Sequence, residues 1–198
     1  MREIIKMIVV LSGICGLAGF ALAQLKAFSD PLIEQQVLKY VKRPAVEYIF
    51  SDADANPTFD QDPIANLKKF KTPDGTEVTV FPAIKDGTLQ AVALEAFGTG
   101  FGGDIGVMVG FAPAGDKLYG IGVTTLKETP GLGMRVTESG YTGQFREMDP
   151  AKALVKADGG DIDAVSGATI SSRGTAMAIQ TANKVFQAIK PEIDKAWQ

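Results

Sequence analysis

The chain has 198 residues and a net charge of −3, with 45% hydrophobic and 22% charged residues. This composition is that of a packed globular protein and excludes a disordered chain. There is no histidine and one cysteine, which excludes an intrachain disulfide and a cysteine-ligated zinc or iron–sulfur site. Without a basic stripe, we expect no nucleic-acid partner. Redox or hydrolytic chemistry would therefore depend on carboxylates, hydroxyls, lysines or a borrowed organic cofactor. We expect no metal site and no catalytic residue.

The first segment of the chain predicts a membrane helix. Met7–Leu25 carries no charge and lies between Lys6 and Lys26. A helix of this length, at about 1.5 Å per residue, spans roughly 28 Å and matches the ~30 Å core of a bilayer. Arg2, Lys6 and the terminal amine favour a cytoplasmic amino terminus. We therefore expect residues 1–28 to be a cytoplasmic N-terminus and a single-pass anchor in the inner (cytoplasmic) membrane, with the rest on the periplasmic side.

A cleaved signal peptide is the alternative for this segment. Ala21-Leu22-Ala23 resembles a small-x-small cleavage site. However, the apolar run exceeds the usual ~7–15 residues of a signal core, and no turn-breaking residue precedes the site. These two features favour a retained anchor.

Residues 29–62 predict a stalk helix followed by a loop. Pro31 stands where a first helical turn accepts proline, behind the capping candidates Ser29 and Asp30. Apolar residues then recur at near-helical spacing. From Ser51 to Asp62, Asp, Asn and Pro dominate, which is typical of a loop.

Residues 63–198 predict the extracytoplasmic domain, which begins with strands. Short turns at Lys85-Asp86-Gly87 and at Pro113–Asp116 would form two hairpins. Four β-rich segments joined in this way indicate an antiparallel sheet. The segments are Glu77–Ile84, Leu89–Phe97, Ile105–Ala112 and Leu118–Leu126.

A helix is predicted over Ile170–Lys190, with Ser171 or Ser172 as its cap and Pro191 as its end. Its apolar residues share one face, which would pack on the sheet. The predicted fold class is α+β, an antiparallel sheet with flanking helices. The apolar face comprises Ala178, Ala182, Val185, Phe186 and Ile189.

The segment just before this helix predicts an anion site. Asp163-Ala164-Val165-Ser166-Gly167-Ala168-Thr169 reads as an extended run that turns through Gly167 into a helix amino terminus. Such a terminus presents unpaired backbone N–H groups and the positive end of the helix dipole. A phosphate is therefore favoured there, next to the Thr169 hydroxyl.

This motif resembles the flavin-attachment motif of the FMN-binding domains in the Rnf complex G subunit and in the C subunit of the sodium-pumping NADH:quinone reductase. In those proteins the last threonine carries FMN through a phosphoester bond, which a separate flavin transferase installs using FAD and magnesium. The resemblance implies covalent FMN on Thr169. It also implies that Asp163, Ser166, Gly167 and Ala168 form the recognition turn.

Two further motifs carry the same resemblance, which covers roughly Leu89 to Lys190. Lys127–Gly133 is similar to the family's Glu-Thr-Pro-Gly-Leu-Gly loop, which lies against the flavin. Gly100–Gly110 resembles the family's glycine-rich turn and following strand. The flavin contacts implied in the first of these motifs are Glu128, Thr129, Gly131, Leu132 and Gly133.

Each motif also has a plain structural interpretation. Ser-Gly-Ala-Thr is a common helix cap, Pro130-Gly131 suits a type II turn, and Lys127 with Glu128 would be a solvated charge pair. The order of the three motifs behind one membrane helix favours the flavin. We expect Phe101, Tyr141 and Trp197 to pack in the core rather than to stack on a flavin.

The resemblance implies an electron-carrier subunit of a redox-driven, ion-translocating membrane complex, without complete catalytic activity alone. The chain holds no Rossmann fingerprint, so other integral and peripheral subunits would supply and accept the electrons. Its short length favours the Rnf type, which couples electron transfer between ferredoxin and NAD to Na⁺ or H⁺ transport. The alternatives are the reductase C subunit, a freestanding FMN domain serving another extracytoplasmic reductase or sensor, and an anchored phosphate- or nucleotide-binding protein without a covalent cofactor.

Overall fold

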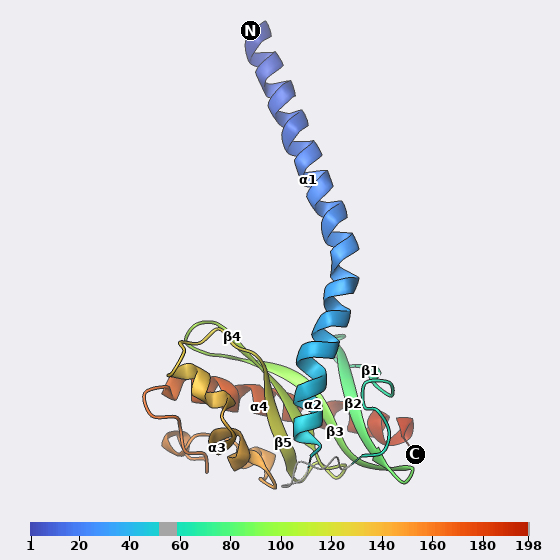
Figure 1. The fold of residues 1–198 in the computed structure, drawn as a ribbon, viewed down its shortest axis with the longest axis vertical. Helices are drawn as coiled ribbons and strands as arrows, with labels where there is room; N and C mark the ends of the chain where they lie inside the picture. The colour runs from blue at the N-terminus through green and yellow to red at the C-terminus, as the bar shows by residue number, and fades with distance from the viewer. Residues whose placement is uncertain (52–58, 198) are drawn as a thin grey trace. The chain divides into compact units, whose positions relative to one another are not determined.

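The computed structural model describes residues 1–51 and 59–197 (Figure 1). The chain divides into two compact units, Met1–Tyr40 and Val41–Gln198. Most of the loop predicted between Ser51 and Asp62, residues 52–58, lies outside the described residues.

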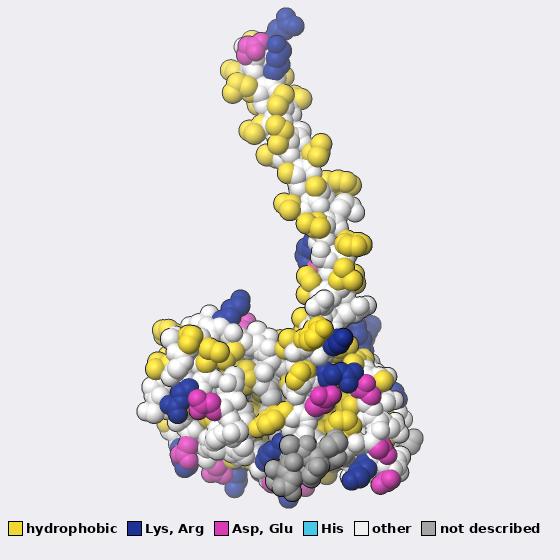
Figure 2. All heavy atoms as spheres, viewed as in Figure 1, with side chains coloured by type: hydrophobic (Ala, Val, Ile, Leu, Met, Phe, Trp, Pro, Cys, Tyr) yellow, Lys and Arg dark blue, Asp and Glu magenta, His cyan; other side chains and the backbone are white. Residues whose placement is uncertain are grey.

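The first unit consists of a long helix, α1 (Arg2–Val37). Large apolar side chains are exposed along its length, and Figure 2 shows them in yellow on the face in view. Its most apolar window has a mean hydropathy of 2.2, and none of that window is buried. By length and composition this helix can cross a membrane, as the sequence predicts.

The predicted helix start at Pro31 is wrong, because Pro31 lies inside α1. A proline in a helix removes one backbone hydrogen bond, and the exposed surface of this helix leaves room for its ring. A five-residue π-helical turn, η1 (Leu38–Lys42), follows α1 and precedes α2 (Arg43–Ile49). Pro44 has no N–H to donate to the carbonyl of Tyr40, which accounts for a change of helical register at this point.

Five strands form one antiparallel sheet whose spatial order, β1-β2-β3-β4-β5, is also the chain order. Asp86 and Gly87 turn the chain between β2 and β3 with positive φ at both residues, as a two-residue hairpin turn requires. The α+β class and the four predicted strands are confirmed. The strands are β1 (Lys68–Lys71), β2 (Glu77–Lys85), β3 (Thr88–Thr99), β4 (Asp104–Phe111) and β5 (Leu118–Thr125).

The strand β1 was not predicted. It has four residues, three of them lysine, and it pairs with β2 at the edge of the sheet. Lysines on an edge strand discourage pairing with another chain, but they also hide the apolar alternation that marks a strand. Only Phe70 of β1 faces the core.

The helix α4 (Thr169–Ala196) lies on one face of the sheet, behind it in Figure 1. The predicted apolar face is confirmed, since Ala178, Ala182, Phe186 and Ile189 are buried against the strands. The ring of Phe186 stacks on Phe111 of β4, with centroids 4.7 Å apart.

Pro191 does not end this helix, contrary to the prediction. The helix continues to Ala196, and Ile193 is buried beyond the proline. Trp197 follows and packs on Phe70, with ring centroids 5.6 Å apart. An interior proline costs about 3 kcal/mol, whereas burying one isoleucine side chain gains about 1.5–3 kcal/mol. The contacts past Pro191 therefore offset the cost of keeping it in the helix.

The opposite face of the sheet carries α2, which lies in front of it in Figure 1. Ala45 faces Gly122 and Ile49 faces Gly110, so glycines on β4 and β5 leave room for the helix. Short helical turns fill the chain between β5 and α4. They are η2 (Gly133–Thr137), α3 (Ser139–Thr142), η3 (Gly143–Phe145), η4 (Pro150–Lys152) and η5 (Lys156–Asp158).

Candidate functional site

The predicted attachment motif folds as a closed turn. The amide of Ala168 donates to the carbonyl of Val165 at 2.9 Å, and Gly167 has a φ of +77°, which favours glycine. The hydroxyl of Ser172 bonds both ends of the turn. It accepts from the amide of Val165 at 3.0 Å and donates to the carbonyl of Ala168 at 3.1 Å. The backbone that presents Thr169 is therefore held in one shape.

The helix α4 begins at Thr169 and not after a serine cap, so the predicted caps Ser171 and Ser172 are wrong. The N-cap is Ala168, and among the described residues no side chain caps this end of the helix. Alanine has no oxygen to offer to the first amides. Thr169 is exposed and is the first residue of this helix. A phosphate there gains about 0.3–1 kcal/mol from the helix dipole.

The second motif folds as the type II turn that its sequence predicts. The amide of Leu132 donates to the carbonyl of Thr129 at 3.2 Å, and Gly131 has a φ of +74°. Pro130 occupies the position before Gly131, where its fixed φ fits the turn. The turn places Leu132 and Gly133 toward the start of α4, since both line a cavity with Thr169.

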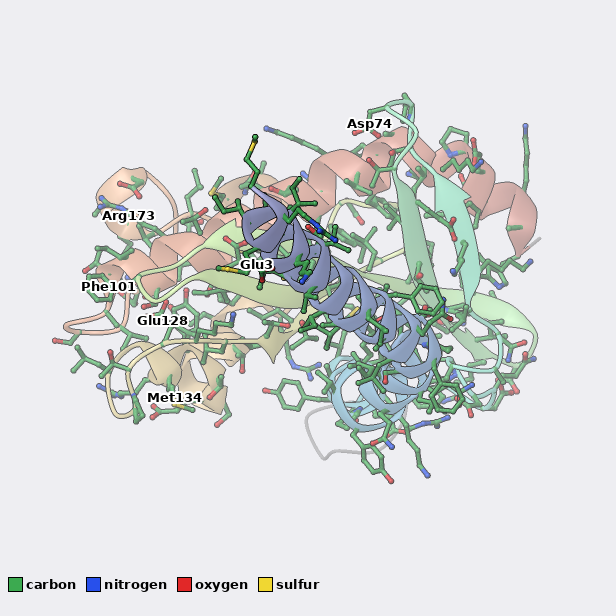
Figure 3. All side chains as sticks on the ribbon, turned by 90° about the horizontal axis from the view of Figure 1, so that it is seen from above. Glu3, Asp74, Phe101, Glu128, Met134 and Arg173 are labelled. Carbon is green, nitrogen blue, oxygen red and sulfur yellow. The ribbon has the colours of Figure 1, made fainter. Side chains whose placement is uncertain are left out.

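Glu128 joins the three motifs. One carboxylate oxygen, Oε1, accepts from the amides of Phe101 at 2.7 Å and Gly102 at 3.0 Å. The other, Oε2, accepts from the hydroxyl of Ser171 at 2.9 Å. Glu128 is 8% exposed, so the solvated charge pair considered for Lys127 and Glu128 is wrong. Figure 3 shows Glu128 beside Phe101.

Glycines make room for this carboxylate. A Cβ on Gly133 would lie 2.5 Å from Glu128 Oε2 and 2.7 Å from the hydroxyl of Ser171. A Cβ on Gly100 would collide with Glu128 Oε1 and with Ile105. The glycines of the two motifs therefore both leave room for the Glu128 carboxylate, which explains why the motifs occur together.

A cavity of about 340 Å³ opens where the motifs meet. It lies within the usual range of small-molecule sites, about 300–1,000 Å³. Three exposed apolar side chains lie on its rim, Phe101, Leu132 and Ile170. Phe101 was expected in the core, but it is 74% exposed. The lining comprises Phe101, Glu128, Thr129, Leu132, Gly133, Gly167, Ala168, Thr169, Ile170 and Ser171.

Two predicted residues of the recognition turn, Asp163 and Ser166, do not line the cavity. Both are exposed. The carboxylate of Asp163 accepts from Lys156 at 2.8 Å on both oxygens. The backbone N–H of Asp163 donates to Oε1 of Gln144 at 2.8 Å, and the backbone carbonyl of Asp163 accepts from Nε2 of Gln144 at 3.2 Å. These contacts hold the strand-like run that leads into the turn.

A surface ion pair connects α4 to the segment before the motif. Arg173 donates to both carboxylate oxygens of Asp158, at 2.7 and 2.6 Å. The hydrogen bond and the charge of Arg173 lower the pKa of Asp158, and Asp158 raises the pKa of Arg173 in turn. Both side chains are largely in water, so the pair orients the segment more than it stabilises the fold.

Sequence reasoning missed the roles of Ser171, Ser172 and Gln144. The two serines were considered only as caps, and their bonds depend on segments 7 and 43 residues away along the chain. Gln144 carried no signal in the sequence. The bonds of these residues depend on tertiary packing, which residue spacing does not reveal.

A comparison with known protein families matches the segments that form this site. Residues 100–184 match the family model described as the FMN-binding domain. The matched stretch runs from the glycine-rich turn through most of α4 and contains every residue that lines the cavity. The chain therefore carries an FMN-binding domain over these residues.

Two similar proteins carry the same name. The chain is 33% identical over 141 residues to the G subunit of the ion-translocating oxidoreductase complex of Cereibacter sphaeroides, covering 68% of this chain and 64% of that relative. It is 39% identical over 102 residues to the protein of the same name from Haemophilus influenzae, covering 48% and 49%. The chain thus spans less than two thirds of the length of these relatives.

A solved structure shares the fold. The crystal structure of Shewanella oneidensis NqrC matches with a TM-score of 0.53 and 24% identity, covering 73% of this chain and 78% of that one. This likeness concerns the fold alone.

The residues present fit FMN. The uncapped amides of α4 suit a phosphate, and Thr169 offers an exposed hydroxyl at the same place. Gly167 leaves open space above the turn, since a Cβ there would meet only Leu132, at 3.9 Å. The apolar rim suits an aromatic ring system.

Proposed function

We propose that Thr169 carries FMN through a phosphoester bond. A flavin transferase would supply the FMN from FAD, since the Thr169 oxygen would bond the FMN phosphorus as the FAD pyrophosphate bond breaks. AMP would leave, and the hydroxyl would lose its proton. The observation that carries this proposal is the exposed Thr169 hydroxyl at the uncapped start of α4, on the wall of the cavity.

We propose further that the chain is an electron-carrier subunit of a membrane-bound, ion-translocating oxidoreductase complex of the Rnf type. The similarity to proteins named as the G subunit of an ion-translocating oxidoreductase complex supports this role. The apolar helix α1 would anchor the chain in the inner membrane, with residues 41–198 on the periplasmic side. Electrons would reach and leave the domain through other integral and peripheral subunits.

FMN supplies one- and two-electron chemistry, and the protein positions the flavin and tunes its reduction potential. The turn closed by Ser172 would hold the attachment point. The amides at the start of α4 would bind the phosphate. Leu132 and Ile170 would keep water from one side of the ring, as exposed apolar residues on the rim.

The mass of the peptide that contains Thr169, taken from membranes of the native organism, tests the attachment. We expect the mass of one FMN moiety on wild-type peptide and on Thr169→Ser, which keeps a hydroxyl. Thr169→Val should lack it, together with the flavin absorbance that survives denaturation. Thr181→Val is the matched control, because Thr181 is an exposed threonine on the same helix. Flavin that persists on Thr169→Val would refute the assignment.

Co-purification tests the complex. A tagged full-length chain, solubilised gently from native membranes, should bring down several integral membrane proteins in fixed ratio. Recovery of the chain alone, with its flavin, would instead support a freestanding carrier that serves another reductase.

A further inference from the structure

The Glu128 carboxylate is a buried charge on the wall of the flavin cavity. It accepts hydrogen bonds from the amides of Phe101 and Gly102 and from the hydroxyl of Ser171. All three donors are neutral. Within the part of the chain that the structure describes, no lysine or arginine forms an ion pair with Glu128. The site therefore holds one carboxylate that no cation among the described residues pairs with directly.

We propose that the fixed negative charge of Glu128 lowers the reduction potential of the flavin bound in this cavity. The inference rests on the proposed attachment of FMN at Thr169. Reduction adds negative charge to the cavity, and a fixed carboxylate on the same wall opposes that addition. The opposition is stronger than at the surface, because burial reduces the screening by water.

The hydrogen bonds alone do not require a charge. A glutamine at position 128 keeps one oxygen for the amides of Phe101 and Gly102. Its NH₂ group can donate to the oxygen of Ser171, whose hydroxyl is free to rotate. Glu128→Gln therefore removes the charge and preserves the contacts between the three motifs. Ser171→Ala does the reverse, because it removes one contact and leaves the charge.

The test is spectroelectrochemical titration of the flavin in the full-length protein, isolated with its flavin from membranes. Glu128→Gln should shift the reduction potential to more positive values, with wild-type flavin content per chain. Ser171→Ala should show no positive shift of comparable size. Asp104→Asn is the control for a carboxylate in water, since Asp104 is exposed at the end of the same glycine-rich turn, and it should match wild type.

A second measurement reports the contacts independently of the flavin. Amide hydrogen exchange at Phe101 and Gly102, in a Thr169→Val background, should stay slow in Glu128→Gln and become faster in Glu128→Ala. An unchanged potential in Glu128→Gln, with FMN on Thr169, would overturn the inference about charge. Equal positive shifts in Glu128→Gln and Ser171→Ala would overturn it too, because geometry would then set the potential. Absence of FMN from the wild-type peptide would instead refute the proposed attachment.

Discussion

The two halves of α4 bury different kinds of side chain against the same sheet. The first half buries polar and small residues, and its hydroxyls bond other segments or the helix backbone. Here Gly174 allows an approach so close that a Cβ would lie 2.6 Å from the carbonyl oxygen of Thr99. The second half buries an apolar stripe, with Phe186 at its centre. Directional bonds fix one shape next to the cavity, whereas the apolar half supplies most of the burial energy. The first half means residues 169–177 in this comparison, and its buried residues are Ser171, Ser172, Gly174, Thr175 and Ala176.

Breaking the apolar half should have the largest effect on stability. Phe186→Ala removes a fully buried ring that stacks on Phe111, so we expect a loss of about 3–5 kcal/mol in the free energy of unfolding. Urea unfolding of the full-length chain in detergent measures it. Met177→Ala, at an exposed position of α4, should change the free energy by less than about 0.5 kcal/mol. A similar loss in both variants would show that the stripe does not hold the helix.

Alkaline pH should weaken the contact beneath the polar half. The buried Tyr141 phenol donates to the carbonyl of Ser172 at 3.2 Å, and burial raises the pKa of Tyr141 to about 12. Between the ordinary pKa of 10.0 and this value, the unfolded chain loses the phenol proton more readily than the folded chain. The resulting stability is therefore complete below pH 10 and decreases as the pH rises toward 12.

The size of this loss follows from the shift of the pKa. It amounts to roughly 2–3 kcal/mol, because each unit corresponds to ~1.36 kcal/mol. The free energy of unfolding of wild type minus that of Tyr141→Phe, measured from pH 8 to 12, isolates the tyrosine from other alkaline titrations. A difference that does not change with pH would contradict the prediction.

A substitution in the polar half of α4 should lower the free energy of unfolding by less and should reduce the flavin content by more. Ser172→Ala leaves the buried amide of Val165 without its acceptor, so we expect a loss of about 1–3 kcal/mol in the free energy of unfolding. Because the turn before Thr169 loses its cross-link, covalent flavin per folded chain should decrease as well. Absorbance of the denatured protein measures the flavin. Phe186→Ala, which leaves the turn intact, should retain wild-type flavin in the fraction that folds. If Ser172→Ala has normal flavin content, the cross-link does not position the attachment point.

The apolar half of α4 was predictable from the sequence, and the bonds of the polar half were not. Periodicity identified the buried face that contains Phe186, because every turn of the helix repeats the same contact with the sheet. Resemblance to a family pointed to Thr169 and to the Glu128–Gly133 loop, and the structure brings these segments together at one cavity. The position of the Glu128 carboxylate was not predictable, since its three donors lie 26, 27 and 43 residues away along the chain.

The errors at Pro31, Pro191 and β1 have related causes. Both prolines were interpreted by local propensity as helix boundaries, yet each helix continues through its proline. Burial of Ile193 and the contact between Trp197 and Phe70 explain the continuation past Pro191. The strand β1 exists because β2 offers it a partner. Tertiary contacts thus decided the structure after Pro191 and at β1, whereas Pro31 lies in a helix without buried residues.

The exposure of Thr169 bears on the order of events during maturation. The hydrogen bonds that shape the turn before it are made within the chain, by Val165, Ala168 and Ser172. The polypeptide can therefore fold first, and the modifying enzyme would meet a finished surface rather than an unfolded segment. On this view, a molecule without flavin is a folded precursor that still awaits its prosthetic group.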